Sequence, residues 1–251
     1  MSPTTFGPPF TSAPNAVAAL TTDGYALLDA VDLTSLTGAV RSGLDAWTGT
    51  WSDLPPDEYL KDGGRYRHRR HTCFVVDEER IEPAPHRAHW QPVEYNALHG
   101  GMQRWFQPIA TAVSEQPAWS RLLVGLGHVF NAVRPASRWF VEAHQFRIDT
   151  ANGIGRPTPE GAHRDGVDFV AVILIGRANV KGGETRVFAA DGPHGQRFTM
   201  IDPWTTLLLD DERIIHETTP VQRSGDAASA PGTRDTLVLT YRRDGFQDDA
   251  A

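Results

Sequence analysis

The chain has 251 residues, of which 40% are hydrophobic and 22% charged, and its formal net charge at pH 7 is -7. This length allows one large domain with a substantial core, and the acidic balance gives no support to a nucleic-acid partner. The single cysteine, Cys73, excludes an intramolecular disulfide and a zinc site built from cysteines, and it fits the cytoplasmic location that we expect.

The first 15 residues are rich in proline, serine and threonine, which predicts a flexible N-terminal arm (1–15) ahead of a single domain (16–251). No Lys or Arg precedes an apolar stretch there, so we expect no secretory signal. The longest wholly apolar run, residues 169–175, is far shorter than the about 20 residues of a membrane-spanning helix. We therefore expect no membrane partner.

Helical patterns dominate the first half of the domain. After a short strand at 24–31, apolar residues at i, i+3 and i+4 spacing predict helices at 32–47, 94–114 and 119–130. Asp32 stands where an N-cap of the first helix is expected, and Pro117 reads as a break before the third. We expect these helices to form a supporting layer over residues 32–130.

After Pro135 the pattern changes to short β-branched and aromatic segments that are separated by Gly, Pro, Asn and Asp. Closely spaced strands of this kind predict an α+β fold with a barrel or two-sheet jelly-roll core at 138–243 and the helices packed on one sheet. The expected strands are Trp139–Asp149, Val167–Ile175, Thr185–Ala189, Arg197–Ile201, Thr206–Leu209, Arg213–Thr219 and Thr233–Arg242.

Three side chains are candidates for a metal site. His163 and Asp165 are two residues apart, so on a strand both side chains point to the same side. His216 lies in a second strand-like segment and offers a third ligand. Two histidines and one carboxylate on one side of an ion form the facial triad of non-haem iron(II) oxygenases. The alternative is a polar turn near a structural histidine.

Arg234 and Thr236 are also two residues apart, at the start of the last long strand. A buried guanidinium fork binds a carboxylate in a bidentate manner, and a nearby hydroxyl adds a hydrogen bond. This pair therefore has the form of an anchor for a dicarboxylate. The alternative is a surface arginine, which is the more common case in a strand.

The motifs HRDG, KGGETRVF, IIHETTP and TRDTLVLTY together resemble the Fe(II)/2-oxoglutarate-dependent dioxygenase superfamily. The segment from PTPEGAHRDG to KGGET is similar to the bacterial group that contains L-isoleucine 4-hydroxylase and the biofilm-stress-motility protein BsmA. The resemblance is strong over 139–243 and weaker before it, around GGRYRHRRHTCFVV.

This resemblance implies a double-stranded β-helix with His163, Asp165 and His216 as iron ligands. It also implies that Arg234, with Thr236, holds the 5-carboxylate of 2-oxoglutarate, so that Fe(II), 2-oxoglutarate and O₂ are the cofactors. The expected reaction is hydroxylation of a free L-amino acid, or sulfoxidation of a methionine-type side chain, with release of succinate and CO₂.

Substrate contacts are expected from two further segments. In the basic segment 63–71, one arginine together with Tyr66 is expected to bind an α-carboxylate, although a solvated strand or loop fits the composition as well. In residues 139–149, Gln145 and Arg147 share one face and Glu142 and His144 the other, and we expect Gln145 and Arg147 to contact the substrate. The pairs His68/His71 and His86/His89 are not expected to form a metal site.

Two other function classes remain open at this point. One is a non-catalytic jelly-roll binding protein in stress or biofilm regulation, whose metal site would be structural. The other is a cupin-like hydrolase or isomerase, in which the same ligands would hold Zn²⁺ or Mn²⁺. The sequence does not fix the substrate, the atom oxidised or the oligomeric state.

Overall fold

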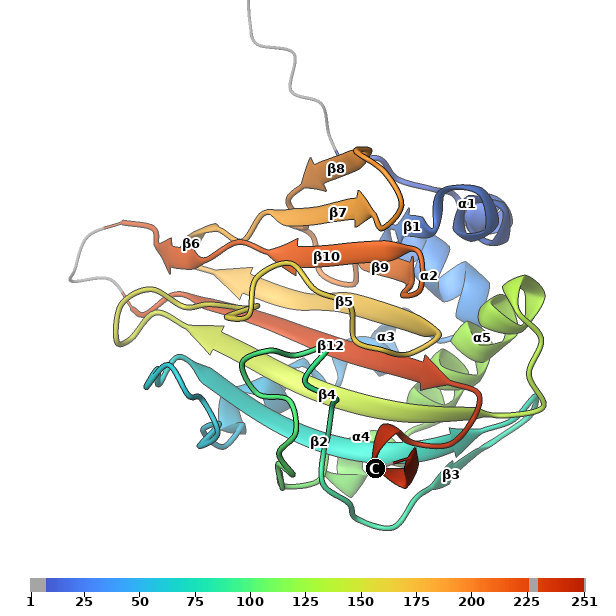
Figure 1. Cartoon of the computed structure of the whole chain (residues 1–251), viewed down its shortest axis with the longest axis horizontal. Helices are drawn as coiled ribbons and strands as arrows, with labels where there is room; N and C mark the ends of the chain where they lie inside the picture. The colour runs from blue at the N-terminus through green and yellow to red at the C-terminus, as the bar shows by residue number, and fades with distance from the viewer. Residues whose placement is uncertain (1–7, 226–229, 251) are drawn as a thin grey trace, which may run out of the picture.

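A seven-stranded antiparallel sheet runs through the computed structural model, which describes residues 8–225 and 230–250 (Figure 1). Its strand order is β1-β9-β5-β12-β4-β2-β3, so that β12, late in the chain, lies between β5 and β4. The strands, in that order, are Tyr25–Leu28, Thr206–Asp210, Phe169–Ala178, Thr233–Arg242, Trp139–Asp149, Arg67–Val76 and Ile81–Pro83.

A smaller layer of strands lies against one face of the large sheet. It consists of the sheet β10-β7-β8 and the pair β11-β6. Val187 and Phe198 of the small layer belong to the same apolar cluster as Leu207 and Leu209 of β9. The two layers form the jelly roll. The strands of the small layer are Ile214–Thr218 (β10), Thr185–Ala189 (β7), Gly195–Phe198 (β8), Val221–Arg223 (β11) and Val180–Gly182 (β6).

Helices cover the opposite face of the large sheet (Figure 1). The longest, α5 (Pro117–Val133), begins with a proline at its first turn, where the missing N–H has no helical partner to lose. Its buried residues recur at helical spacing and pack in one cluster with the sheet. The others are α1 (Ala16–Asp23), α2 (Ala30–Thr37), α3 (Arg41–Asp45), α4 (Thr111–Ser114) and the 3₁₀ turns Ala13–Asn15, Thr48–Asp53 and Gln247–Ala250.

Alternation along the central strands separates the two faces. In β12, Leu237 and Leu239 pack under the helices, whereas Arg234 and Thr236 face the small layer. The large sheet therefore contributes an apolar face to the core and a more polar face to the space between the layers. Among the described residues, none of the helices has the length and apolarity that crossing a bilayer requires.

The expected α+β fold, a jelly roll with helices packed on one sheet, is confirmed. Strands Trp139–Asp149, Thr185–Ala189 and Thr233–Arg242 have the predicted bounds, and the predicted helix at 119–130 lies inside α5. The strand Arg67–Val76 carries the basic segment into the middle of the fold and was not among the predicted strands.

The predicted helix at 94–114 is wrong. Residues 94–110 form turns and extended chain, and only Thr111–Ser114 is helical. Gly100 packs so closely that a Cβ there would lie 2.5 Å from the carbonyl oxygen of Asn96, and Gly101 has φ +73°. The two glycines therefore turn the chain where the apolar spacing suggests that a helix continues.

Two other boundaries also differ from the prediction. The first helix begins at Ala30, with Asp29 rather than Asp32 as its N-cap. It ends at Thr37, with Gly38 (φ 67°) as its C-cap, instead of continuing to residue 47. The expected arm is shorter, because residues 8–15 belong to the fold: the amide of Thr11 donates to the carbonyl of Leu27. Residues 1–7 of the arm lie outside the described residues.

Candidate metal centre and its cavity

A cavity lies between the large sheet and the small layer, and its lining brings together most of the predicted site residues. Strands β2, β4 and β12 form its floor, while β10 and the segments 89–104 and 157–167 enclose it. The lining includes His163, Asp165, His216, Arg234 and Thr236. The five residues that the sequence proposed for a metal and a carboxylate therefore share one cavity.

His163 and His216 face each other across an isolated antiparallel bridge. The backbone amide of His163 donates to the carbonyl of His216 over 3.0 Å, and the reverse bond is 2.9 Å. Their ring centroids are 4.7 Å apart, and the Nε2 atom of each lies 3.8 Å from a carboxylate oxygen of Asp165. Two ligands that each lie about 2.1 Å from one ion are separated by about 3.0–3.5 Å, so a small contraction brings all three onto one ion.

The surroundings of the two histidines differ. Nδ1 of His163 donates to the carbonyl oxygen of Gly161 over 2.9 Å, and the Asp165 and Glu160 carboxylates raise the pKa of His163 against the effect of its burial. Burial, together with the neighbouring His163, holds the pKa of His216 well below its ordinary value, so its imidazole is neutral at pH 7. A neutral imidazole has the free lone pair that a metal ligand needs.

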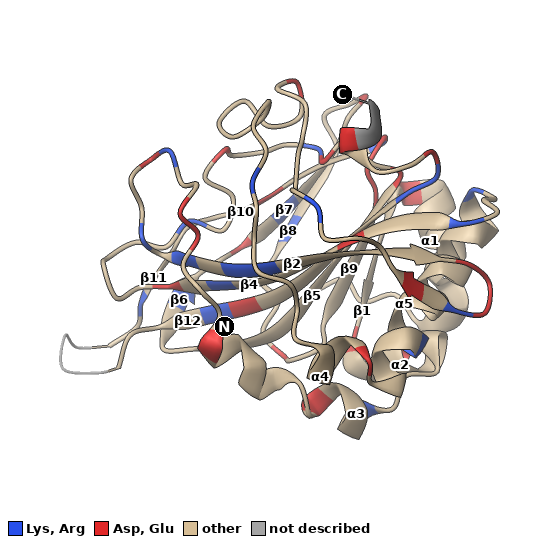
Figure 2. Ribbon diagram, turned by 90° about the horizontal axis from the view of Figure 1, so that it is seen from below, with Lys and Arg blue, Asp and Glu red and all other residues tan. Residues whose placement is uncertain are grey.

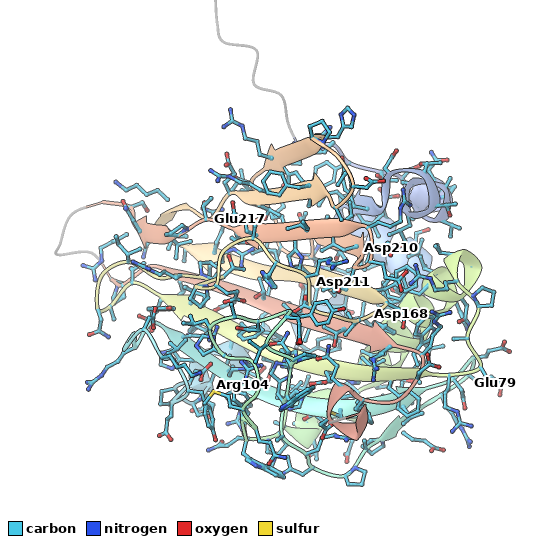
Figure 3. The ribbon with its side chains drawn as sticks, viewed as in Figure 1. Glu79, Arg104, Asp168, Asp210, Asp211 and Glu217 are labelled. Atoms are coloured by element: carbon cyan, nitrogen blue, oxygen red, sulfur yellow. The ribbon has the colours of Figure 1, made fainter. Side chains whose placement is uncertain are left out.

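Asp165 is held in place by a turn and not by a strand, which corrects the expected strand geometry. β5 begins only at Phe169. Asp211 accepts hydrogen bonds from the backbone amides of Asp165, Gly166 and Val167 at 2.9, 2.7 and 3.1 Å (Asp211 is labelled in Figure 3). Burial and the nearby Asp165 carboxylate raise the pKa of Asp211 to about 7.

Two glutamines support the same turn. Nε2 of Gln247, near the end of the chain, donates to the carbonyl oxygens of Asp165 and Gly166 at 2.8 and 2.9 Å. Nε2 of Gln91 donates to Oδ1 of Asp165 at 3.2 Å. The orientation of the Asp165 carboxylate therefore depends on residues from three distant parts of the chain.

Replacing Asp211 by alanine is expected to weaken iron(II) binding by about 10–100-fold, the usual effect of losing an outer partner of a metal ligand. Three amides of the turn lose their acceptor, so Asp165 is no longer fixed. Anaerobic iron(II) titration measures the change, with Asp191→Ala in an exposed turn as the control. A folded Asp211→Ala protein with wild-type iron affinity would show that the turn does not need this carboxylate.

Arg234 is a buried cation with unused donors. The residue is 3% exposed, and its Nε and Nη2 atoms have no hydrogen-bond partner among the described residues. Burial, together with the nearby Arg177, lowers its pKa to about 10, so it stays protonated at pH 7. Thr236 is the next residue on the same face of β12. Unpaired donors of this kind are costly, and a bound carboxylate would satisfy them.

Three more guanidinium groups, those of Arg67, Arg69 and Arg104, line the opposite side of the floor and the adjoining loop. Figure 2 shows basic residues on β2, β4 and β12, which are adjacent in the sheet. Asp57 accepts a 2.8 Å hydrogen bond from Arg67 and lies 3.8 Å from Arg69. Nη2 of Arg67, Nε of Arg69 and Nε of Arg104 have no partner among the described residues. This cationic wall therefore offers positive charge to an anionic group in the cavity.

A second cluster of metal-type side chains, His71, His89, Glu142 and His144, lies beside the wall with its donor and acceptor atoms within 4.8 Å of one another. The short contacts identify it as a hydrogen-bonded cluster. Glu142 Oε2 is 2.8 Å from Nε2 of His71 and 2.7 Å from Nδ1 of His89. These separations are normal for hydrogen bonds from two imidazole N–H groups to one carboxylate oxygen.

The predicted substrate contacts of Tyr66, Gln145 and Arg147 are not supported, because none of the three lines the cavity. The Tyr66 hydroxyl donates to Asp62, Gln145 donates to Thr50, and Arg147 pairs with Asp235 in two hydrogen bonds of 2.8 and 2.7 Å. The other face of β4, with Glu142 and His144, lines the cavity instead. Arginines of the basic segment 63–71 do line the cavity, as expected, and they are Arg67 and Arg69.

The comparisons with known proteins agree with this geometry. A family model described as 2OG-Fe dioxygenase matches residues 48–240. A bsmA homolog from Methylobium petroleophilum PM1 has a crystal structure with 53% identity and a TM-score of 0.90, and the match covers 95% of this chain and 96% of that one. Among curated proteins, none matches.

Two more distant structures share the fold. One is IDO from Bacillus thuringiensis, with 15% identity, a TM-score of 0.73 and coverage of 96% of this chain and 100% of that one. The other is the Fe(II)/(alpha)ketoglutarate-dependent dioxygenase TqaL, with 20% identity, a TM-score of 0.70 and coverage of 94% and 88%.

Proposed function

Because the chain belongs to the 2OG-Fe dioxygenase family, in the group of BsmA homologues, we propose that it oxidises a free L-amino acid with His163, Asp165 and His216 as its iron ligands. The family is enzymatic and uses Fe(II), 2-oxoglutarate and O₂. The residue assignment rests on one observation: these three side chains lie in the same cavity as Arg234, whose Nε and Nη2 atoms have no partner among the described residues.

When bound together, iron(II), 2-oxoglutarate and O₂ supply an oxidant that transfers one oxygen atom to a C–H bond or a thioether sulfur, while 2-oxoglutarate leaves as succinate and CO₂. The protein contributes placement. His163, Asp165 and His216 would hold the ion through two imidazoles and one carboxylate, a ligand set that would leave positions for 2-oxoglutarate and O₂. Arg234 and Thr236 hold the distal carboxylate of 2-oxoglutarate. Val172 and Val238 line the cavity and help to exclude water.

The cationic wall of Arg67, Arg69 and Arg104 supports the choice of an amino acid. These arginines line the cavity and come from β2 and the segment 89–104, whereas Arg234 comes from β12. The carboxylate of a second small molecule would satisfy them while Arg234 binds 2-oxoglutarate. A substrate with an α-carboxylate fits this arrangement.

The test is succinate formation from 2-oxoglutarate, measured with each of the twenty L-amino acids and with no amino acid, together with the mass of the product. We expect at least one amino acid with an aliphatic or thioether side chain to raise succinate formation and to gain one oxygen atom. Stoichiometric binding of an amino acid without turnover would instead indicate a non-catalytic binding protein.

A further inference from the structure

Glu142 is the carboxylate at the centre of the hydrogen-bonded cluster described above. It lies on the cavity face of β4, and its side chain is 9% exposed. Two histidines fix one of its oxygens: Nε2 of His71, on β2, and Nδ1 of His89, on the loop that closes the cavity, both approach Oε2. Oε1 accepts no hydrogen bond from the described residues.

The histidines around Glu142 are uncharged, and two of them donate hydrogen bonds to it. Burial lowers the pKa of His71 and holds the pKa values of His89 and His144 well below the ordinary value, so all three are neutral at pH 7. Each neutral imidazole has a single N–H, and His71 and His89 direct it at Oε2 of Glu142. The negative charge of the carboxylate is therefore oriented but not neutralised, and Oε1 is left for a cationic partner.

Charged groups of both signs line the part of the cavity formed by β2, β4 and the segments 89–104 and 157–167. The guanidinium groups of Arg67, Arg69 and Arg104 and the carboxylates of Glu142 and Glu160 lie there, and Oε1 of Glu160 is 3.6 Å from Nε2 of His163. Asp57 is already paired with the arginines, whereas Oε2 of Glu160 is buried without a partner among the described residues. A zwitterionic ligand would place its carboxylate near the guanidinium groups and its ammonium near the Oε1 atom of Glu142, so that both of its charges would meet a group of opposite charge.

We propose that Glu142 binds the ammonium group of the substrate, while Arg67 and Arg104 bind its carboxylate, so that the site selects a zwitterion with a free amino group. This inference rests on the proposed function and goes beyond it by naming the residue that recognises the amino group. His71 and His89 are positioning residues, because they act only through Glu142.

The test is the dissociation constant of the amino acid that gives the strongest response among the twenty, measured without O₂ from the change that it causes in the visible band of the iron(II)–2-oxoglutarate complex. Glu142→Gln keeps the shape of the side chain and both histidine contacts. We expect it to raise the dissociation constant by about 10–100-fold, the loss of one hydrogen bond to a charged group. Affinity for 2-oxoglutarate and the thermal midpoint should stay near wild type.

Binding of a second ligand shows how much the amino group alone contributes to affinity. The 2-hydroxy acid with the same side chain lacks the ammonium, so it should bind wild type weakly and bind Glu142→Gln with the same affinity as wild type. Glu142→Asp keeps the charge on a shorter side chain and should recover part of the affinity for the amino acid. Glu82→Gln, an exposed glutamate on β3 of the same sheet, is the matched control.

Three outcomes separate the possibilities. If Glu142→Gln binds the amino acid as wild type does, or loses affinity for both ligands equally, Glu142 does not recognise the ammonium. If metal analysis finds a second metal per chain that Glu142→Gln removes, the cluster is a metal site and the proposal is wrong. If wild type responds to none of the twenty amino acids, the proposed function itself fails, and this inference fails with it.

Discussion

Replacing His216 by alanine is expected to reduce iron(II) affinity and succinate formation by more than about 100-fold. Loss of a residue that hydrogen-bonds to a metal ligand costs about 10–100-fold in affinity or activity, and loss of a ligand itself should cost more. The change removes one of three ligand atoms. It leaves the backbone bridge between residues 163 and 216 in place, since that bridge uses main-chain atoms only. The fold should therefore survive while the metal site is lost.

Anaerobic iron titration and succinate assay measure these two effects, and the thermal midpoint shows whether the protein is folded. His128→Ala is the matched control, because His128 is exposed on α5 and its Nε2 contacts the backbone carbonyl of Glu78. Full succinate production in both His163→Ala and His216→Ala would mean that the metal lies elsewhere.

Replacing Arg234 by glutamine is expected to raise the KM for 2-oxoglutarate by about 10–100-fold, the loss that follows when a charged hydrogen-bond donor to a carboxylate is removed. Iron affinity should change little, because Arg234 is not among the three proposed ligands. The free protein should not lose stability, because Nε and Nη2 of Arg234 are buried without a partner among the described residues.

A second measurement on Arg234 does not depend on turnover. A ligand that binds only the folded state stabilises it, so 2-oxoglutarate should raise the thermal midpoint of the iron(II)-loaded wild type and not that of Arg234→Gln. Arg234→Lys keeps the charge without the planar fork and should give an intermediate effect. Arg197→Gln, on exposed β8, is the control. An unchanged response to 2-oxoglutarate in Arg234→Gln would place its anchor at another residue.

The sequence predicted the second half of the fold well because β-branched alternation and glycine-rich turns are local signals. It also placed His163, Asp165 and His216 together, but for a partly mistaken reason. The proximity of Asp165 comes from a turn fixed by Asp211, and no local pattern at 163–165 reveals a partner 46 residues away.

The cavity floor was harder to predict, because its residues are polar. The run RYRHRRH has the composition of a solvated segment, but Arg67, Arg69 and His71 are buried against partners that lie outside this run. Asp57, 10 residues before Arg67, pairs with the arginines, and Glu142, 71 residues after His71, pairs with the histidine. Pairing with residues outside a strand cannot be read from the spacing within it.

The sequence does contain a signal for which face of β4 lines the cavity. Val141 and Ala143 share a face with Gln145 and Arg147, and both are fully buried in the cluster that includes the helices. The apolar half of a strand face marks the side that packs on the core. Glu142 and His144 therefore had to face the other way, toward the cavity.

The position of β12 in the sheet has a consequence for how the protein is made. β12 carries Arg234 and lies between β5 and β4, yet it leaves the ribosome after all the other strands of this sheet. Until it is synthesised, the sheet remains in two separate parts, and Gln247, which supports the turn at Asp165, follows still later. We expect an unfinished chain to lack both the 2-oxoglutarate anchor and a firm iron site, so that oxidative chemistry begins only when the surrounding cavity is complete.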